Sequence, residues 1–434
     1  SRRFIMSQIN IRNLSNENDD GSPEIVGVST FSATSFFVPP KGTTAERPSD
    51  CEPGSIRFNT DTSNLEYFSG KMFGWSQFEL VTPNLGGGTG SNTGFGVRGI
   101  FVGGYAPSQS LSIEFITIST LGNSQDFGDL NSGYSAGVAT NDRTRGFYSG
   151  GNSGSQQNMN FCTLASMGDS VDGGGDLIVA TKGKPTGNSS STRGVISGGR
   201  DHPGAAEINT IQYHTIQSLG NASDFGDLLN PRSYSGGNCQ SSTRGIIAAG
   251  FLPAAPTRTN SIEFITMASL GNSTDFGDLA AAVSNLGAAS NSTRGIFAGG
   301  SSPTALRDMQ FITIASTGNA QDFGDLIRSG TNGYAAASSS IKMYCMGGSD
   351  ADIGVITIST TGNETDFGGD SGNSQGYMGA VGSQTRGIAV GGGPSLQDRM
   401  DYIDYATAGD AKDFGDLGTS SSGNKGLSNA HGGL

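Results

Sequence analysis

The chain has 434 residues, a formal net charge of −13, only 15% charged residues and 70 glycines. This acidic balance, without basic clusters, argues against a nucleic-acid partner. No run of about 20 apolar residues occurs, so membrane insertion is not expected. Cys51, Cys162, Cys239 and Cys345 have no paired spacing, which predicts free thiols in a protein made in a reducing cytoplasm.

The N-terminal region differs in composition from the rest of the chain. Residues 1–53 are first polar and then β-prone, and they are predicted to form an extended arm. Residues 54–82 contain the alternating stretches SIRFNT and LEYFSG around a turn-forming segment, which predicts a β-hairpin module. Phe58, Tyr67, Phe68 and Trp75 are expected to bury one face of it. Because two strands alone are marginally stable, the hairpin should pack on another protein, on further copies or on the rest of the chain.

A Gly-rich segment, residues 83–96, reads as a flexible linker. After it, a unit whose clearest copies contain TRGIFAGG, SIEFITMAS and LGNSTDFGDL recurs seven times through residues 97–434. A period of 40 to 50 residues made of short strands and Gly-rich turns is typical of a β-propeller with one four-stranded blade per copy. The sequence therefore predicts an all-β chain with a seven-bladed propeller. The basic residues that open the copies lie 44 to 51 residues apart: Arg98, Arg145, Arg193, Arg244, Arg294, Lys342 and Arg386.

Each copy has four recognisable stretches. A strand that ends in a glycine pair is followed by a more apolar strand, then by Asp-Phe-Gly-Asp-Leu as the outer strand, and last by a small-residue segment as the innermost strand. The C-terminal stretch 426–430 resembles that last segment and is predicted to complete the first copy, which lacks one. The phenylalanine of the outer strand should be a buried aromatic wedge between sheets, at Phe127, Phe225, Phe276, Phe323, Phe367 and Phe414.

The arginine and the two aspartates of the repeat allow two interpretations. Paired carboxylates near turns can bind Ca²⁺ or a glycan. A feature repeated in nearly every copy is more often scaffold, which favours an Arg–Asp pair that holds each blade to itself or its neighbour. The residues of this set are Arg98, Asp126, Asp129, Arg145, Arg193, Asp224, Asp227, Arg244, Asp275, Asp278, Arg294, Asp322, Asp325, Arg386, Asp413 and Asp416.

No catalytic constellation stands out. The Asp-Phe-Gly tripeptide lacks the other kinase motifs, and the three histidines have no metal-ligand spacing. We therefore predict no catalytic residue, no metal site and no cofactor. Binding is more expected in loops that vary between copies, with six exposed candidates: Tyr105, His202, Phe251, Pro253, Pro256 and Arg258. Copies two and six, which depart from the pattern at 172–176 and 341–343, should be the softest blades.

The order of a Gly-Gly strand, a second strand and an aromatic anchor resembles a kelch repeat, with the phenylalanine of DFGDL in place of the usual tryptophan. This likeness concerns architecture alone.

A second resemblance covers almost the whole chain. The hairpin GSIRFNTDT…LEYFSG…W, the opening MSQINIRNLSNENDDG and the TRGIFAGG…DFGDL repeats resemble fibre- and appendage-type structural proteins of cyanophage-like tailed bacteriophages. The resemblance implies a virion protein whose N-terminal residues 1–82 contact other virion proteins, and whose propeller is displayed as a tail or neck fibre or a capsid appendage. It implies a homo-oligomer, a trimer or hexamer, and contact with the host surface, where a glycan is a possible ligand. The alternatives are a glycan-binding adhesive propeller outside a virion and, less favoured, a glycan-cleaving propeller enzyme.

Overall fold

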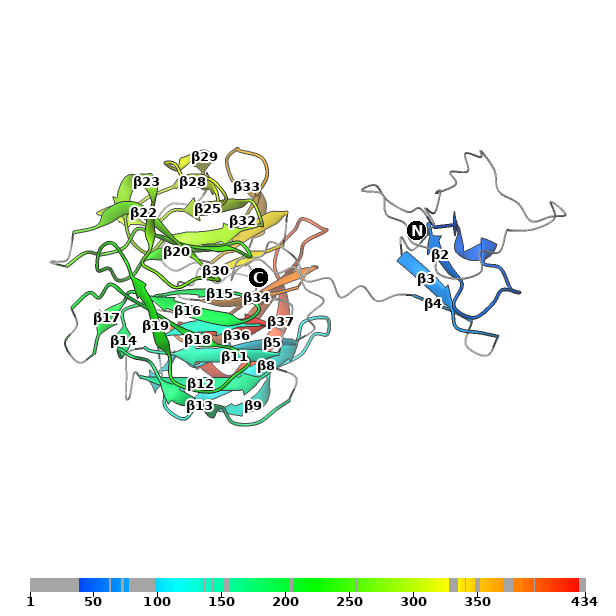
Figure 1. Ribbon diagram of the computed structural model, residues 1–434, viewed down its shortest axis with the longest axis horizontal. Coiled ribbons are helices and arrows are strands. Elements are labelled where there is room, and N and C mark those ends of the chain that lie inside the picture. Colours follow the sequence, from blue (N-terminus) through cyan, green and yellow to red (C-terminus); the bar gives the residue numbers. More distant parts are fainter. Residues whose placement is uncertain are drawn as a thin grey trace, which may run out of the picture. The chain divides into compact units, whose positions relative to one another are not determined.

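The computed structural model describes residues 39–77 and 98–428, except 62–63, 72–73, 134, 136, 143, 152–156, 165, 203, 205, 254–256, 328–334, 340, 348–351, 370–375, 377, 384 and 394. The chain divides into two compact units, Ser1–Leu80 and Val81–Leu434 (Figure 1). Strands dominate both, so the predicted all-β class is confirmed. Within the described ranges, no helix has the length and apolar character needed to cross a membrane. Most of the predicted arm and all of the predicted linker lie outside the described residues.

The N-terminal unit contains one four-stranded sheet and a single 3-10 turn, η1 (Thr44–Glu46). The predicted hairpin is present, with Ile56 opposite Tyr67 and Phe58 opposite Leu65. Two further strands extend it on either side, one of them from the region predicted to be an arm, and the first strand runs parallel to its neighbour. The strand order follows the sequence: β1 (Lys41–Gly42), β2 (Ile56–Asn59), β3 (Asn64–Phe68) and β4 (Trp75–Gln77).

The C-terminal unit contains seven four-stranded antiparallel sheets among its described residues, which we number by copy. Sheet 1 is β38 (Lys425–Ser428), β5 (Arg98–Val102), β8 (Ser112–Thr117) and β9 (Gln125–Asp129); sheet 2 is β10 (Val138–Asn141), β11 (Arg145–Ser149), β12 (Asn158–Thr163) and β13 (Val171–Asp176); sheet 3 is β15 (Thr186–Ser189), β16 (Arg193–Ser197), β18 (Thr210–Thr215) and β19 (Ser223–Asp227); sheet 4 is β20 (Gly236–Gln240), β21 (Arg244–Ala248), β22 (Thr259–Thr266) and β23 (Thr274–Val283).

The remaining sheets repeat the same order. Sheet 5 is β24 (Gly287–Ser290), β25 (Arg294–Ala298), β28 (Asp308–Thr313) and β29 (Gln321–Asp325); sheet 6 is β30 (Ala335–Ser338), β31 (Lys342–Met346), β32 (Asp352–Thr357) and β33 (Thr365–Gly369); sheet 7 is β34 (Gly379–Gly382), β35 (Arg386–Val390), β36 (Gln397–Asp404) and β37 (Lys412–Ser421). Three short two-stranded pairings lie in the loops: β6 (Tyr105–Ala106) with β7 (Ser108–Gln109), β14 (Thr181–Lys182) with β17 (Arg200–Asp201), and β26 (Ser301–Ser302) with β27 (Thr304–Ala305).

The first strands of the seven sheets contact one another in a closed cycle. β10 contacts β15, and the contacts continue through β20, β24, β30, β34 and β38 back to β10. In Figure 1, β15, β20, β30 and β34 are labelled near the middle of this unit, and β13, β23 and β29 toward its periphery. The predicted pairing of the C-terminal strand with the first copy is confirmed, because β38 runs antiparallel to β5 with Leu427 opposite Ile100.

The glycine of DFGDL is required by the backbone. In sheet 1 the register between β8 and β9 shifts at Ile113/Glu114, as at a β-bulge, and Gly128 has a φ of +143°. A β-carbon on Gly128 would lie 2.4 Å from the carbonyl of Gly168 in sheet 2. Only glycine fits here, because the backbone has a positive φ and because the main chain of the next sheet occupies the space of a β-carbon. The same combination recurs at Gly226, Gly277, Gly324, Gly368 and Gly415.

Candidate functional site

Neighbouring sheets of the C-terminal unit are joined by the arginine that opens each copy. Its Nη1 donates a hydrogen bond to a main-chain carbonyl of the next sheet, as from Arg98 to Leu164 at 2.8 Å. The cycle closes where Arg386 donates to Ile118 of sheet 1 at 3.2 Å. Hydrogen bonds from a charged donor are stronger than neutral ones, so these contacts hold the sheets together. The other four are Arg145 to Ile216, Arg193 to Met267, Arg244 to Ile314 and Arg294 to Ile358.

An aromatic ring supports each of these six guanidinium groups. The ring belongs to the third strand of the same sheet and lies 4.2 Å from the Arg294 guanidinium at Phe311 and 5.5 Å from that of Arg145 at Phe161. In five of these sheets the ring meets the phenylalanine of DFGDL edge to face, a favourable geometry for aromatic pairs. The pairs are Phe115–Phe127, Tyr213–Phe225, Phe264–Phe276, Phe311–Phe323 and Tyr402–Phe414. All of these DFGDL phenylalanines, and Phe367 in sheet 6, are buried.

Sheet 6 makes the same connection with a different residue. Lys342 stands where the others have arginine, and Val355 where they have the supporting aromatic ring. Tyr344, fully buried on the second strand, instead donates its hydroxyl to the carbonyl of Tyr405 in sheet 7 at 3.2 Å. Its ring meets Phe367 edge to face at 5.1 Å and stacks on Tyr405 at 4.4 Å. One tyrosine thus replaces both the arginine and the aromatic ring of the regular copies.

The predicted pairing of arginine with aspartate within a copy is wrong. Arg98 lies opposite Thr117, whereas Asp126 lies opposite Glu114, three residues further along the sheet. At about 3.3 Å per residue and 4.8 Å per strand, the two are about 10 Å apart in each direction, too far for an ion pair. The aspartates of DFGDL lie exposed on the fourth strand, and the arginine that opens each regular copy donates to a main-chain carbonyl of the next sheet.

The aspartates act through local and main-chain hydrogen bonds instead. The first one accepts the N–H of the glycine two residues on, as Asp126 does from Gly128 at 3.0 Å, and Asp224, Asp322, Asp366 and Asp413 do the same. The second donates its own N–H to the side chain that follows the glycine of the next sheet's Gly-Asn turn. These bonds run from Asp129 to Asp169, Asp176 to Asn221, Asp227 to Asn272, Asp278 to Asn319, Asp325 to Asn363 and Asp416 to Asn123. In sheet 6 the donor at this position is Gly369, which bonds to Asp410.

The turn residues were missed as contacts between sheets, although Gly-Asn or Gly-Asp precedes the outer strand in every copy. Main-chain bonds flank six of them on both sides, such as Gly168 N–H to Phe127 carbonyl at 2.7 Å and Ser170 N–H to Asp129 carbonyl at 2.8 Å. Asn221 has one such bond, from the Ala222 N–H to the Asp176 carbonyl at 2.9 Å. The outer strand of each sheet is therefore paired with the turn of the next one. Unpaired strand edges promote aggregation, and this arrangement covers part of each edge.

A third inter-sheet contact comes from the middle of the third strand. Glu263 accepts the N–H of Leu229 in sheet 3 at 3.0 Å, and Gln310 accepts that of Ala280 in sheet 4 at 2.8 Å. Glu263 is also ion-paired with fully buried Arg232, a pair that the repeat pattern does not signal because other copies lack this arginine. In sheet 6 the corresponding position is Gly354, and the acceptor for Ile327 is Glu364, the residue just before the fourth strand, at 2.9 Å.

The variable-loop candidates are found in different settings. Tyr105, His202 and Pro253 are exposed, whereas Phe251 is half-buried between Arg258, 4.9 Å from its ring, and Tyr234, 5.8 Å away. Pro256 lies outside the described residues. The three exposed members belong to different copies, the first, the third and the fourth.

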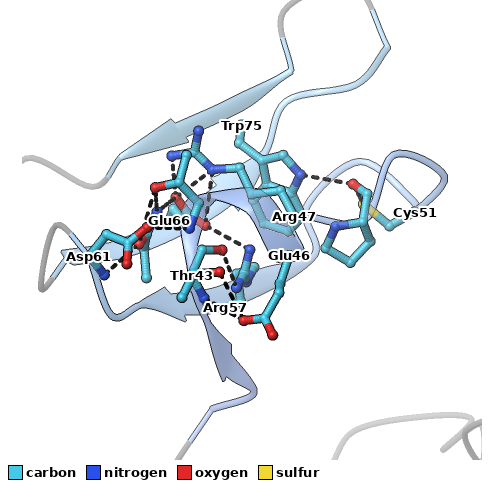
Figure 2. Close-up of polar contacts among 11 residues, drawn as sticks. Thr43, Glu46, Arg47, Cys51, Arg57, Asp61, Glu66 and Trp75 are labelled. Atoms are coloured by element: carbon cyan, nitrogen blue, oxygen red, sulfur yellow. Dashed lines mark hydrogen bonds and ion pairs between the residues drawn. The ribbon is translucent and has the colours of Figure 1, made fainter.

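In the N-terminal unit, a buried carboxylate organises the sheet (Figure 2). Glu66 is fully buried and accepts hydrogen bonds from Arg47 at 2.7 Å and Asn59 at 3.1 Å, and Arg57 lies 3.3 Å away. Burial acts to raise the pKa of Glu66, but these hydrogen bonds and the two arginine charges outweigh it and lower the pKa. The indole of Trp75 donates to the Pro48 carbonyl at 3.0 Å, so the segment before β2 is held on this face.

The four aromatic residues of the module do not share a face, contrary to expectation. Side chains alternate along a strand, so Arg57 and Phe68 lie on the face of Glu66, where Phe68 contacts Trp75 at 5.5 Å. Phe58 and Tyr67 lie on the opposite face with Ile56, which is 47% exposed. One face of the module is thus covered by buried, ion-paired side chains, and the other is apolar and partly exposed.

Among the described residues, no three His, Cys, Asp or Glu side chains gather closely enough to bind a metal ion. All four cysteines are free. A scan against protein-family models finds no match, and a search of curated proteins finds none either.

Proposed function

We propose that residues 97–434 form a kelch-like seven-bladed β-propeller, with each numbered sheet as one blade. The closed cycle of first strands supports this architecture, as does the pairing of the C-terminal strand with the first copy. Propellers close radially and leave only short, protected edges. The arginine bonds and the Gly-Asn turn bonds between successive sheets are consistent with such closure.

We further propose that the protein is a structural component of a tailed-phage virion and not an enzyme. Its N-terminal residues 1–82 would anchor it to other virion proteins, and the propeller would be displayed as a tail or neck fibre or a capsid appendage. The observation that most supports this proposal is the difference between the two faces of the N-terminal sheet. The partly exposed face, with Ile56, Phe58 and Tyr67, is apolar enough to be buried in an interface with another protein. Oligomers of three or six copies and contact with the host surface belong to the same proposal.

Immunogold labelling of purified virus particles with antibody to residues 97–434 tests the location. Gold at one defined site on the tail, neck or capsid is the expected result. Particles without label, with antigen confined to the soluble lysate, would contradict a virion role and favour the adhesive, glycan-binding propeller.

The anchoring face is tested by Ile56→Asp, which places a charge on an apolar surface that is buried upon assembly. We expect incorporation into particles to fall at least tenfold while the isolated protein keeps its circular dichroism spectrum. Ser49→Asp, at an exposed position of the segment that Trp75 holds on the opposite face, is the matched control and should incorporate normally. Equal incorporation of both variants and the unmodified chain would show that this face is not the anchor.

A further inference from the structure

The turn that leads into the fourth strand carries an exposed residue at the same place in every copy, just before the glycine of Gly-Asn or Gly-Asp. In sheets 1 to 4 this residue is large and apolar, and its exposed fraction is between 51% and 63%. These four side chains, which we call the apolar arc, are Leu121, Met167, Leu219 and Leu270. In sheets 5 to 7 the residue is small or polar and is exposed as well: Thr317, Thr361 and Ala408.

The fold does not require large apolar residues at these positions. The glycine after Leu270 and the glycine after Thr317 both donate to the carbonyl of a DFGDL phenylalanine at 2.7 Å, so the turn forms equally well with either residue. Each side chain of the arc is more than half exposed and therefore gains little from packing within the chain. Single exposed apolar residues are common on proteins, but a recurrence on four successive sheets indicates a contact surface.

The four positions of the arc follow one another around the cycle of sheets. The innermost strands of sheets 1 to 4 contact each other in succession, β38 with β10, β10 with β15 and β15 with β20. The hydrogen bonds of the Gly-Asn and Gly-Asp turns hold each position against the outer strand of the preceding sheet. The large apolar side chains are therefore gathered on one side of the cycle, one per sheet.

Exposed carboxylates accompany the arc. The glycine after Leu121 donates to the Phe414 carbonyl at 2.8 Å, and the equivalent bonds place Met167 beside Phe127 and Leu270 beside Phe225. Each of these phenylalanines is flanked by two exposed aspartates, which are Asp126, Asp129, Asp224, Asp227, Asp413 and Asp416. The arginines that open the copies are half-buried, and Lys412 is the only lysine or arginine on a fourth strand. The exposed charge beside the arc is therefore mainly negative.

A surface that combines apolar side chains with carboxylates is complementary to one that combines apolar side chains with cations. We propose that the apolar arc docks a protein segment that presents apolar side chains between lysine or arginine residues. A second copy of the chain, whose net charge is also −13, is not the occupant, because its carboxylates would oppose those of the first copy. The inference goes beyond the proposed virion role and requires only the C-terminal unit, so it can be tested whether or not the protein is part of a particle.

The test is a fluorescence anisotropy titration of the full-length chain against three labelled synthetic peptides at constant ionic strength. One peptide is an amphipathic sequence of leucine and lysine, the second has serine in place of leucine, and the third has glutamate in place of lysine. We expect saturable binding of the leucine–lysine peptide, at least tenfold tighter than binding of either of the others. Equal binding of the leucine–lysine and serine–lysine peptides would mean attraction by charge alone and would overturn the proposal, as would a failure to bind any of the three.

The arc itself is tested by a fourfold variant in which each of its residues is replaced by threonine, the residue of sheets 5 and 6. Because these side chains are exposed, the variant should keep its circular dichroism spectrum and bind the leucine–lysine peptide at least tenfold more weakly. The matched control is the double variant Leu111→Thr/Leu229→Thr, which removes leucines that are 46% and 53% exposed at the other end of their strands. Unchanged binding by the fourfold variant, or an equal loss in the control, would contradict the assignment.

The carboxylates give a second readout that leaves the arc intact. Asp129→Asn/Asp227→Asn removes charge beside Met167 and Leu270, so it should weaken binding of the leucine–lysine peptide and reduce the salt dependence of that binding. Unchanged affinity and salt dependence would show that the carboxylates take no part. Sedimentation velocity separates the other occupant: self-association of the unmodified chain that the fourfold variant loses would assign the arc to a second copy and overturn the proposal.

Discussion

The side chain by which sheet 5 contacts sheet 6 differs from the one by which sheet 6 contacts sheet 7, yet both donate to the equivalent main-chain carbonyl. In the first, Arg294 donates to the Ile358 carbonyl at 3.0 Å and rests on Phe311. In the second, Tyr344 donates to the Tyr405 carbonyl and fills the aromatic position from a neighbouring strand. The comparison shows what the interface demands: a donor for one buried carbonyl and an aromatic ring against the phenylalanine of the outer strand.

The largest effect is expected at the irregular interface. Tyr344→Ala removes a fully buried ring that stacks on Tyr405 and contacts Phe367, and it leaves a carbonyl without its donor. Large-to-small changes of this kind cost about 4 kcal/mol, which should appear as a marked fall in the midpoint of denaturant unfolding. Tyr344→Phe keeps the ring and loses only the hydroxyl bond, so its cost should be about 1 kcal/mol. Equal losses in the two variants would contradict the division of roles between ring and hydroxyl.

A second irregular position makes stability depend on pH. His214 in sheet 3 occupies the place of Ile265 and Ile312 in sheets 4 and 5. It lies 3.3 Å from the Thr140 hydroxyl and 4.3 Å, centre to centre, from the Phe147 ring. Burial lowers its pKa from 6.5 to about 4.

The unfolded chain therefore binds a proton at His214 between about pH 6.5 and pH 4 while the folded chain does not. Stability should fall as the pH is lowered through that window, by about 3 kcal/mol from this residue. Urea denaturation of the unmodified chain and of His214→Ile at pH 7 and pH 4.5 measures the difference. Carboxylates contribute equally to both proteins, so parallel losses would show that His214 does not carry the effect.

The smallest expected effect compares two residues of a regular copy: the arginine that bonds to the next sheet, and the aspartate that the repeat pattern suggested as its partner. Arg294→Met removes a charged hydrogen bond and a contact with an aromatic face, at a cost of about 2 kcal/mol. Asp322→Asn should change stability by less than about 0.5 kcal/mol, because the amide oxygen can still accept the Gly324 N–H. Thermal unfolding of both variants gives the comparison. If Asp322→Asn lowered the stability as much as Arg294→Met does, the result would support an Arg–Asp pair and contradict the contacts described above.

Much of the architecture could be predicted from the chain alone, because a repeat that forms one four-stranded sheet per copy leaves a periodic signal. The period, the four stretches per copy and the missing strand of the first copy were readable as patterns of apolar residues and glycines. The buried aromatic ring of each copy could be predicted as well, since a phenylalanine that recurs at the same place in the outer-strand motif indicates a core position. In the N-terminal module, the hairpin could be predicted from alternation, but Glu66 and its arginines could not, as charged residues usually mark a solvent-exposed face.

The sequence by itself determined the all-β class, the number of copies and the residues that recur in each. Only the tertiary structure decided what those residues contact. The partner of each arginine is a main-chain carbonyl 64 to 74 residues further along the chain, or in sheet 1 for Arg386. A carbonyl is present at every residue and leaves no side-chain pattern, so its choice depends on how neighbouring sheets meet in space. Tyr344 can replace an arginine for the same reason, because any side-chain donor that reaches the carbonyl can make this hydrogen bond.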